Sequence, residues 1–309
     1  MGCIVTGPTA NYLDGDQNSR LHLQHGPIDL IIGVDGAISL ELESYFRQHA
    51  FALANRRFQT VLQELVDELP LLKGQARIDS PEPQGATAQR MMAAVRPYAE
   101  THFITPMAAV AGAVADEILA AMLAGFPGGD RPRRIYVNNG GDIAIHLDEN
   151  AEFRIGMARE DGQALGAFTV QATRPSRGVA TSGRGGRSLS MGIADSVTIV
   201  ARNAAEADAA VSLVANAVDL PGHPAITRKR AIDVVDDSDL GEHLVVIGCG
   251  ELNALECETA LASGAAEAER FIAQGLIHRA GLFLGNHGRI VDGLAASDTS
   301  PLLETRRYA

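Results

Sequence analysis

The stretch VATSGRGGRSLSMGIADSVTIVA, residues 179–201, decides between two fold classes. Gly178 and Gly183 have the spacing of the GxxxxGK[ST] phosphate-binding loop, but Arg184 stands where that loop requires Lys. A loop of that kind also runs directly into a helix, whereas SVTIVA at 196–201 has strong β propensity. The stretch therefore argues against a P-loop nucleotide-binding fold.

The stretch also lies in a window without acidic residues, between Asp161 and Asp195, in a chain whose formal net charge is −12. The arginines in this window are Arg174, Arg177, Arg184 and Arg187. Arginine presents a planar fork suited to phosphate or carboxylate, and glycines let backbone N–H groups approach an anion. The window predicts an anion-binding loop. The alternative is a solvated loop whose arginines pair with acids elsewhere.

The surrounding chain mixes strands and helices without strict βαβ alternation, which favours a layered α+β fold over a doubly wound sheet. One domain is expected over residues 1–292, followed by a loose tail at 293–309. Strands are predicted at 20–34 (two, broken by Gly-Pro), 134–147 (a hairpin around Asn-Gly-Gly), 168–171, 196–201, 243–249 and 276–290 (a hairpin), and helices at 41–69, 105–122, 203–218 and 257–274.

Composition limits the classes of partner. Hydrophobic residues make up 46% of the 309 residues, enough for a sizeable core, and the acidic charge argues against nucleic-acid or membrane-surface binding. Cys3, Cys249 and Cys257 suit neither a disulfide framework nor a zinc site, so a cytoplasmic location is expected. No stretch is expected to be long and apolar enough to span a membrane. The Gly2–Cys3 acylation pattern is interpreted as a chance match, because nothing polybasic follows it.

Two helices carry candidate ligand-binding features. Thr105 is the expected N-cap of a helix whose first residue is Pro106 and whose body is largely Ala and Gly. Small side chains fit tight packing against a sheet, and they also leave the helix N–H groups open to an anion. On the helix expected to begin after Asn203, Asp208 and Ser212 are four residues apart and share a face, as partial ligands of Mg²⁺ would. Ordinary helix-surface residues are the alternative.

The order of these motifs resembles an uncharacterised, UPF-type protein family related to the ApbE-type FAD:protein FMN transferases. The resemblance covers about residues 20–290 and rests on PMAAVAGAVAD (106–116), VNNGGDI (137–143), ATSG (180–183), GIADSVTIVA (192–201) and ADAAVS (207–212). It implies an ApbE-like fold, a Mg²⁺ site at Asp208 and Ser212, and FAD or another small anionic or nucleotide ligand. The residues that it implies for the ligand are Thr105, Ala108, Asn139, Gly140, Gly141, Thr181, Ser182, Gly183, Arg184 and Arg187.

The sequence departs from the transferases at residues that matter for chemistry. Ala111 stands in place of their Lys and Gly192 in place of their His, and the Pro-x-Thr-Gly segment after that His is missing. Asp142 and Asp195 remain as catalytic candidates. Three hypotheses stay open: a metal-dependent flavin transferase or FAD-cleaving enzyme, a non-catalytic flavin-binding module, and an enzyme for another small anion. The Ala-rich surfaces are compatible with a homodimer.

Overall fold

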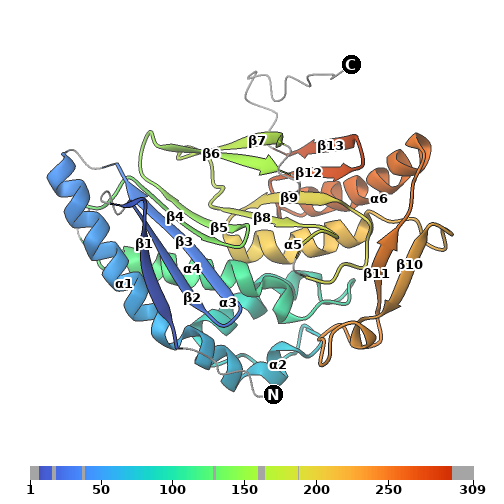
Figure 1. Cartoon of the computed structure of the whole chain (residues 1–309), viewed down its shortest axis with the longest axis horizontal. Helices are drawn as coiled ribbons and strands as arrows, with labels where there is room; N and C mark the ends of the chain where they lie inside the picture. Colours follow the sequence, from blue (N-terminus) through green and yellow to red (C-terminus); the bar gives the residue numbers. More distant parts are fainter. Residues whose placement is uncertain are drawn as a thin grey trace.

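A computed structural model describes residues 7–15, 19–36, 39–127, 130–158, 164–186 and 188–293. Its main element in that part of the chain is a nine-stranded sheet in which every neighbouring pair is antiparallel (Figure 1). The strands in sheet order are β1 (Thr9–Leu13), β2 (Arg20–His25), β3 (Ile28–Asp35), β4 (Arg134–Asn139), β5 (Asp142–Leu147), β8 (Gly178–Ser182), β9 (Ser196–Ala201), β12 (Arg279–Leu284) and β13 (His287–Asp292). The expected α+β fold is confirmed.

Helices cover one face of this sheet and form the main core with it. They are α1 (Leu40–Asp67), α2 (Leu69–Leu72), α3 (Ala86–Val95), α4 (Val110–Leu123), α5 (Ala204–Ala217) and α6 (Ala254–Ala273). Strands supply alternate residues to the core, as Leu21 and Leu23 of β2 do. Because α4 and α5 are built largely of small residues, they lie close to the sheet and to each other, in the centre of the molecule.

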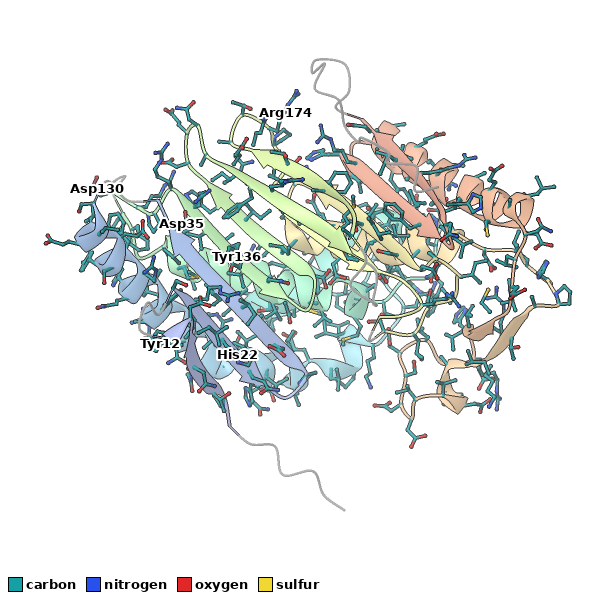
Figure 2. All side chains as sticks on the ribbon, turned by 45° about the horizontal axis from the view of Figure 1, so that its top comes forward. Tyr12, His22, Asp35, Asp130, Tyr136 and Arg174 are labelled. Carbon is teal, nitrogen blue, oxygen red and sulfur yellow. The ribbon has the colours of Figure 1, made fainter. Side chains whose placement is uncertain are left out.

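The opposite face of the sheet is covered only in part. The hairpin of β6 (Glu152–Ala158) and β7 (Ala164–Gln171) packs over β5, β8 and β9, and encloses a second, smaller core that includes Phe168 and Val170. Over β2–β4 this face carries polar and aromatic side chains, among them His22, Asp35 and Tyr136 (Figure 2). The Tyr136 ring lies on Gly33 of the neighbouring strand, where an added Cβ would come within 2.2 Å of Tyr136 Cε1. Only glycine fits beneath that ring.

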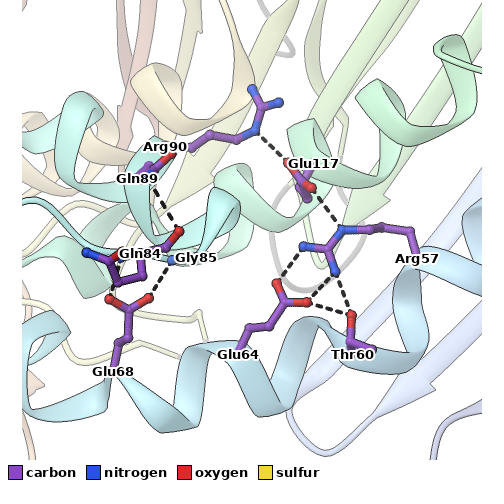
Figure 3. A network of polar contacts seen from close by, with 9 residues as sticks. All are labelled: Arg57, Thr60, Glu64, Glu68, Gln84, Gly85, Gln89, Arg90 and Glu117. Atoms are coloured by element: carbon purple, nitrogen blue, oxygen red, sulfur yellow. Dashed lines mark hydrogen bonds and ion pairs between the residues drawn. The ribbon is translucent and has the colours of Figure 1, made fainter.

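Ion pairs connect the helices on the other face. Glu117 of α4 accepts from Arg57 of α1 at 2.8 Å and from Arg90 of α3 at 3.0 Å, and Arg57 also pairs with Glu64 (Figure 3). The Glu117 side chain is 11% exposed, so two arginines compensate one largely buried carboxylate. The network fixes α1, α3 and α4 relative to one another.

Several local predictions need correction. The helix expected at 41–69 is divided, because α1 ends at Asp67 and the short α2 begins at Leu69. The strands β1, β6, β8 and β10 (Ile226–Arg230) and the helix α3 were not anticipated. The segment Pro106–Leu123 is long and apolar enough to cross a membrane, contrary to expectation, yet 61% of it is buried inside the fold, as in a core helix of a soluble protein. All but the first residue of the tail expected at 293–309, and the Gly2–Cys3 pattern, lie outside the described residues.

A third, two-stranded sheet forms an arm beside the main sheet. Its strands are β10 (Ile226–Arg230) and β11 (Leu244–Cys249). The arm contacts the end of the arginine-rich loop, because the β11 residue Val246 donates its N–H to the Ser190 carbonyl at 2.8 Å. It also contacts the start of the α4 segment, where the Phe103 ring lies 3.9 Å from the His243 ring.

Candidate functional site

The candidate site is centred on the crossing of α4 and α5. An added Cβ on Gly112 would lie 2.2 Å from the Ala204 carbonyl oxygen, so the two backbones touch at this point. Gly178 of β8 makes a similar contact, because its Cβ would lie 1.9 Å from the Asn203 carbonyl carbon. Glycine is required at both positions by close approach, and the start of α5 is confined between α4 and the sheet.

Each helix at this crossing donates N–H groups to a carboxylate of the other. Asp116 of α4 accepts from the N–H groups of Ala204 and Ala205 at 3.1 and 2.9 Å, and Asp208 of α5 accepts from Gly112 N–H at 2.9 Å. These donors belong to the first turns of their helices, where N–H groups lack partners within the helix and favour negative charge. The two aspartates therefore act as reciprocal caps.

Electrostatics distinguish the two carboxylates. Burial raises the pKa of Asp116 to about 6, although its two N–H bonds oppose the shift. Removal from water, followed by the nearby charge of Asp142, raises the pKa of Asp208 well above its usual value. No described residue forms an ion pair with Asp208. A cation placed beside Asp208 and Asp142 would favour the charged form of Asp208 and so oppose the rise in its pKa.

Ser212 lies one turn after Asp208 on α5 and is partly buried. Among the described residues no group of three or more His, Cys, Asp or Glu side chains has the arrangement of a metal site. A metal at Asp208 would therefore take part of its coordination from hydroxyl, carbonyl or ligand oxygens, which suits Mg²⁺ rather than Zn²⁺.

The predicted hairpin brings the next residues to the same place. Gly140 and Gly141 form the turn between β4 and β5 with φ values of 65° and 118°, which favour glycine. The Asn139 side chain donates to the Ala111 carbonyl at 3.1 Å, and so connects the turn to the first turn of α4. Asp142 is buried and accepts from Thr181 N–H at 3.3 Å.

The neighbouring residues Thr181 and Ser182, both predicted to bind the ligand, direct their side chains to opposite faces of the sheet. The hydroxyl of Thr181 lies 3.1 Å from that of Thr198, and the Thr181 residue is exposed. Since Ala180 belongs to the core on the helix side, strand alternation places the Thr181 side chain on the opposite face and that of Ser182 on the helix side. Thr181 therefore contributes to the cluster through its backbone N–H.

An ion pair closes the loop after Ser182, so Arg184 follows the alternative expectation that the arginines pair with acids. Arg184 contacts Asp195 Oδ1 at 2.7 Å, and Gly285 donates its N–H to Asp195 Oδ2 at 2.7 Å. Gly183 packs against the same residue, because its Cβ would lie 2.4 Å from the Asp195 carbonyl oxygen. This geometry makes Asp195 an anchor of the loop. Arg187 lies outside the described residues.

The start of the α4 segment differs from the prediction. Pro106–Ala109 forms a 3₁₀ turn, and the Thr105 side chain makes no capping bond to it. The Thr105 hydroxyl instead donates to Asp239, from the arm, at 2.5 Å. Ala108 is only partly buried. Thr105 therefore occupies the expected N-cap position before Pro106, but its hydroxyl bonds a residue 134 positions away instead of capping the helix.

Arg177 was predicted with the anion-binding arginines, but its guanidinium is bonded to backbone carbonyl oxygens. Its guanidinium donates to the carbonyl oxygens of Gln171, Ala172, Arg174 and Ser176 at 2.6 to 3.4 Å. Four carbonyls occupy the donors that an anion would need. Arg177 therefore holds the turn between β7 and β8.

Fold and site together define an ApbE-like α+β protein. The family described as AbpE bacteria matches residues 10–291, and the chain belongs to that family. Relatives include a UPF0280 protein of Methanothermobacter thermautotrophicus, 34% identical over 172 residues, which cover 53% of this chain and 62% of that protein. A UPF0280 protein of Methanothrix thermoacetophila is 36% identical over 146 residues, which cover 47% of this chain and 57% of that protein. The chain thus spans about three-fifths of the length of these relatives.

Two solved structures are similar at lower levels. The flavin transferase ApbE from Vibrio cholerae is 13% identical, with a TM-score of 0.38 over 92% of this chain and 97% of that one. An ApbE protein from Thermotoga maritima is 19% identical, with a TM-score of 0.30 over 50% of this chain and 52% of that one. These values are too low to indicate a shared activity.

Proposed function

We propose that this protein binds FAD or a related phosphorylated ligand together with a divalent cation at the crossing of α4 and α5. The observation that carries the proposal is the environment of Asp208. Its carboxylate accepts from the first turn of α4, lies near the negative charge of Asp142, and forms no ion pair with a described residue. A hard cation satisfies such a carboxylate, and the Ser212 hydroxyl one turn away is a suitable second ligand.

Phosphates of the ligand would meet a divalent cation from one side and donors of the chain from the other. Bound there, the cation would neutralise phosphate charge. The chain's own contributions are the backbone around Gly183, the Gly140–Gly141 turn and Arg184, whose side chain is 37% exposed at the edge of its pair with Asp195. Arginine can bind a phosphate oxygen while it keeps one carboxylate contact, because its five donors form a fork.

A non-catalytic flavin-binding module is the second candidate function, and one observation favours it. An added Cβ on Gly192 would lie 2.1 Å from the Ala215 carbonyl oxygen, so the position aligned with the transferases' His admits no side chain. Ala111 offers no functional group where they have Lys. Binding without turnover requires neither group.

The binding test uses Mn²⁺ as a paramagnetic substitute for Mg²⁺. Free and bound Mn²⁺ are measured by electron paramagnetic resonance, first on the wild-type protein and then on Asp208→Asn and Ser212→Ala. We expect Asp208→Asn to weaken Mn²⁺ binding at least tenfold, since it removes the charged ligand. Glu117→Gln is the matched control, because it removes a buried carboxylate of α4 that is bonded to arginines. Unchanged Mn²⁺ affinity in Asp208→Asn would contradict the proposed site.

The activity test separates the two candidate functions. Protein, FAD and Mg²⁺ are incubated together, and FMN and AMP are measured by chromatography. Cleavage of the pyrophosphate by water yields FMN and AMP in equal amounts, whereas transfer to a hydroxyl yields AMP and a bound flavin. FAD-dependent thermal stabilisation without either product indicates the binding module. Stabilisation by other phosphates but not by flavins would contradict the flavin assignment.

A further inference from the structure

The buried carboxylate of Asp116, on α4, accepts hydrogen bonds at both of its oxygens from the first turn of α5. Oδ1 accepts from Ala204 N–H and Oδ2 from Ala205 N–H, while the Asn203 side chain accepts from Glu206 N–H at 2.8 Å. The residue is 8% exposed. Among the unpaired N–H groups with which a helix begins, the first three of α5 are thus satisfied by fixed acceptors. No other described residue forms a hydrogen bond or ion pair with Asp116, and its carboxylate is bonded to α5 rather than directed at the ligand region.

The position of α5 along its axis has little freedom at this end. Gly112 touches the Ala204 carbonyl, and Gly178 touches the Asn203 carbonyl from the sheet side. A close backbone contact prevents approach but does not prevent α5 from sliding or lifting away. The bonds to Asp116 do prevent that, since a small displacement of Ala204 and Ala205 would stretch both of them.

Asp208 lies one turn beyond these anchored residues, on the same rigid helix. Its bond to Gly112 N–H therefore depends on where Asp116 holds the helix start. Both aspartates connect the same two helices, but only Asp208 is near Asp142 and one turn from Ser212. One carboxylate can bind a ligand while the other keeps the helices in register.

We infer that Asp116 is a positioning residue, which holds α5 so that the Asp208 carboxylate faces the first turn of α4 and the cation site. This inference rests on the proposed function, because it concerns cation binding at Asp208. Residues that orient a metal-binding side chain without touching the metal typically contribute 10- to 100-fold in metal affinity. Asp116 acts on Asp208 through its bonds to the N–H groups of Ala204 and Ala205, and not through a bond to the Asp208 side chain.

The experiment compares Asp116→Asn with Glu117→Gln. The two residues are adjacent on α4 and equally exposed, at 8%, and both substitutions remove one negative charge. Asn offers one acceptor oxygen where Asp offers two, so one α5 N–H loses its partner. Mn²⁺ binding is measured at low temperature, where both variants are folded, and amide hydrogen exchange is followed across 204–208.

We expect Asp116→Asn to weaken Mn²⁺ binding roughly tenfold and to speed exchange at 204–208. Glu117→Gln should lower the Tm yet leave both readouts near the wild-type values. A Tm loss in Asp116→Asn with Mn²⁺ affinity within twofold of the wild type would overturn the inference. Should Asp116→Asn fail to fold, Asp116→Glu keeps both oxygens but displaces them, and wild-type affinity in that variant would overturn it equally.

The outcomes also separate this inference from the proposed function. If the wild-type protein binds no Mn²⁺, the proposed function fails, and a positioning role toward a cation fails with it. If the wild type binds Mn²⁺ and Asp208→Asn does not, the function stands, and the result for Asp116→Asn alone decides the inference.

Discussion

Gly112→Ala tests whether the α4–α5 crossing is as tight as the site requires. The new Cβ would lie 2.2 Å from the Ala204 carbonyl oxygen and 2.4 Å from its carbon, and both atoms belong to the backbone. Neither can rotate away, so the helices must separate by roughly 1 Å to reach ordinary contact. Overpacking of this kind costs about 1–3 kcal/mol, and the upper end is expected because Asp116 and Asp208 both bridge the same crossing.

The assay is thermal unfolding combined with Mn²⁺ binding. A loss of about 3 kcal/mol corresponds to a Tm decrease of roughly 6 °C in a chain of this size. Gly156→Ala is the matched control, since nothing lies within 4 Å of its added Cβ. That change should be neutral or slightly stabilising, because alanine restricts the unfolded chain. Equal Tm values for Gly112→Ala and Gly156→Ala would refute the close crossing.

Three further predictions address other parts of the molecule. Glu117→Ala should destabilise the fold by about 3 kcal/mol in urea unfolding, since it leaves two arginines without their shared carboxylate; a loss below about 1 kcal/mol would contradict the network. Burial lowers the pKa of His146 to about 4, so the unfolded chain binds this proton first and stability is lost as pH falls from about 6.5 towards 4. Urea unfolding of His146→Asn should show a flatter pH dependence there, and an identical slope would count against burial as the cause. Asp195→Asn should speed hydrogen exchange at 183–186 because it weakens the Arg184 contact, with a stability change within about 1 kcal/mol; unchanged exchange would refute the anchoring role.

Local sequence signals were sufficient to predict β9 and α5, two of the elements around the candidate site. The strong β propensity of 196–201 and the position of Asn203 predicted β9 and α5, and the structure confirms both. Asn203 accepts from the Glu206 N–H at 2.8 Å, while the Glu206 side chain pairs with Arg202 at 2.9 Å. The complete capping box belongs to α6, where Asn253 and Glu256 bond each other's backbone.

Contacts between distant residues were not predictable from the sequence. Asp116 bonds Ala204 across 88 positions and Thr105 bonds Asp239 across 134, and no spacing rule connects such pairs. The glycines carried a partial signal. Gly112 and Gly178 stand among residues of good helix or strand propensity, which indicates close backbone approach without naming the partner.

The two departures from the transferase pattern are built into the packing. Gly192 rests against the Ala215 carbonyl, and the Ala111 carbonyl accepts from Asn139, which also connects α4 to the Gly140–Gly141 turn. A His at position 192 would therefore require either the loop around Gly192 or the end of α5, where Ala215 lies, to move. If α5 moves, the Asp208 carboxylate moves with it, because both residues belong to the same helix. The cation site that we propose and a transferase-type His at position 192 would then compete for the position of α5.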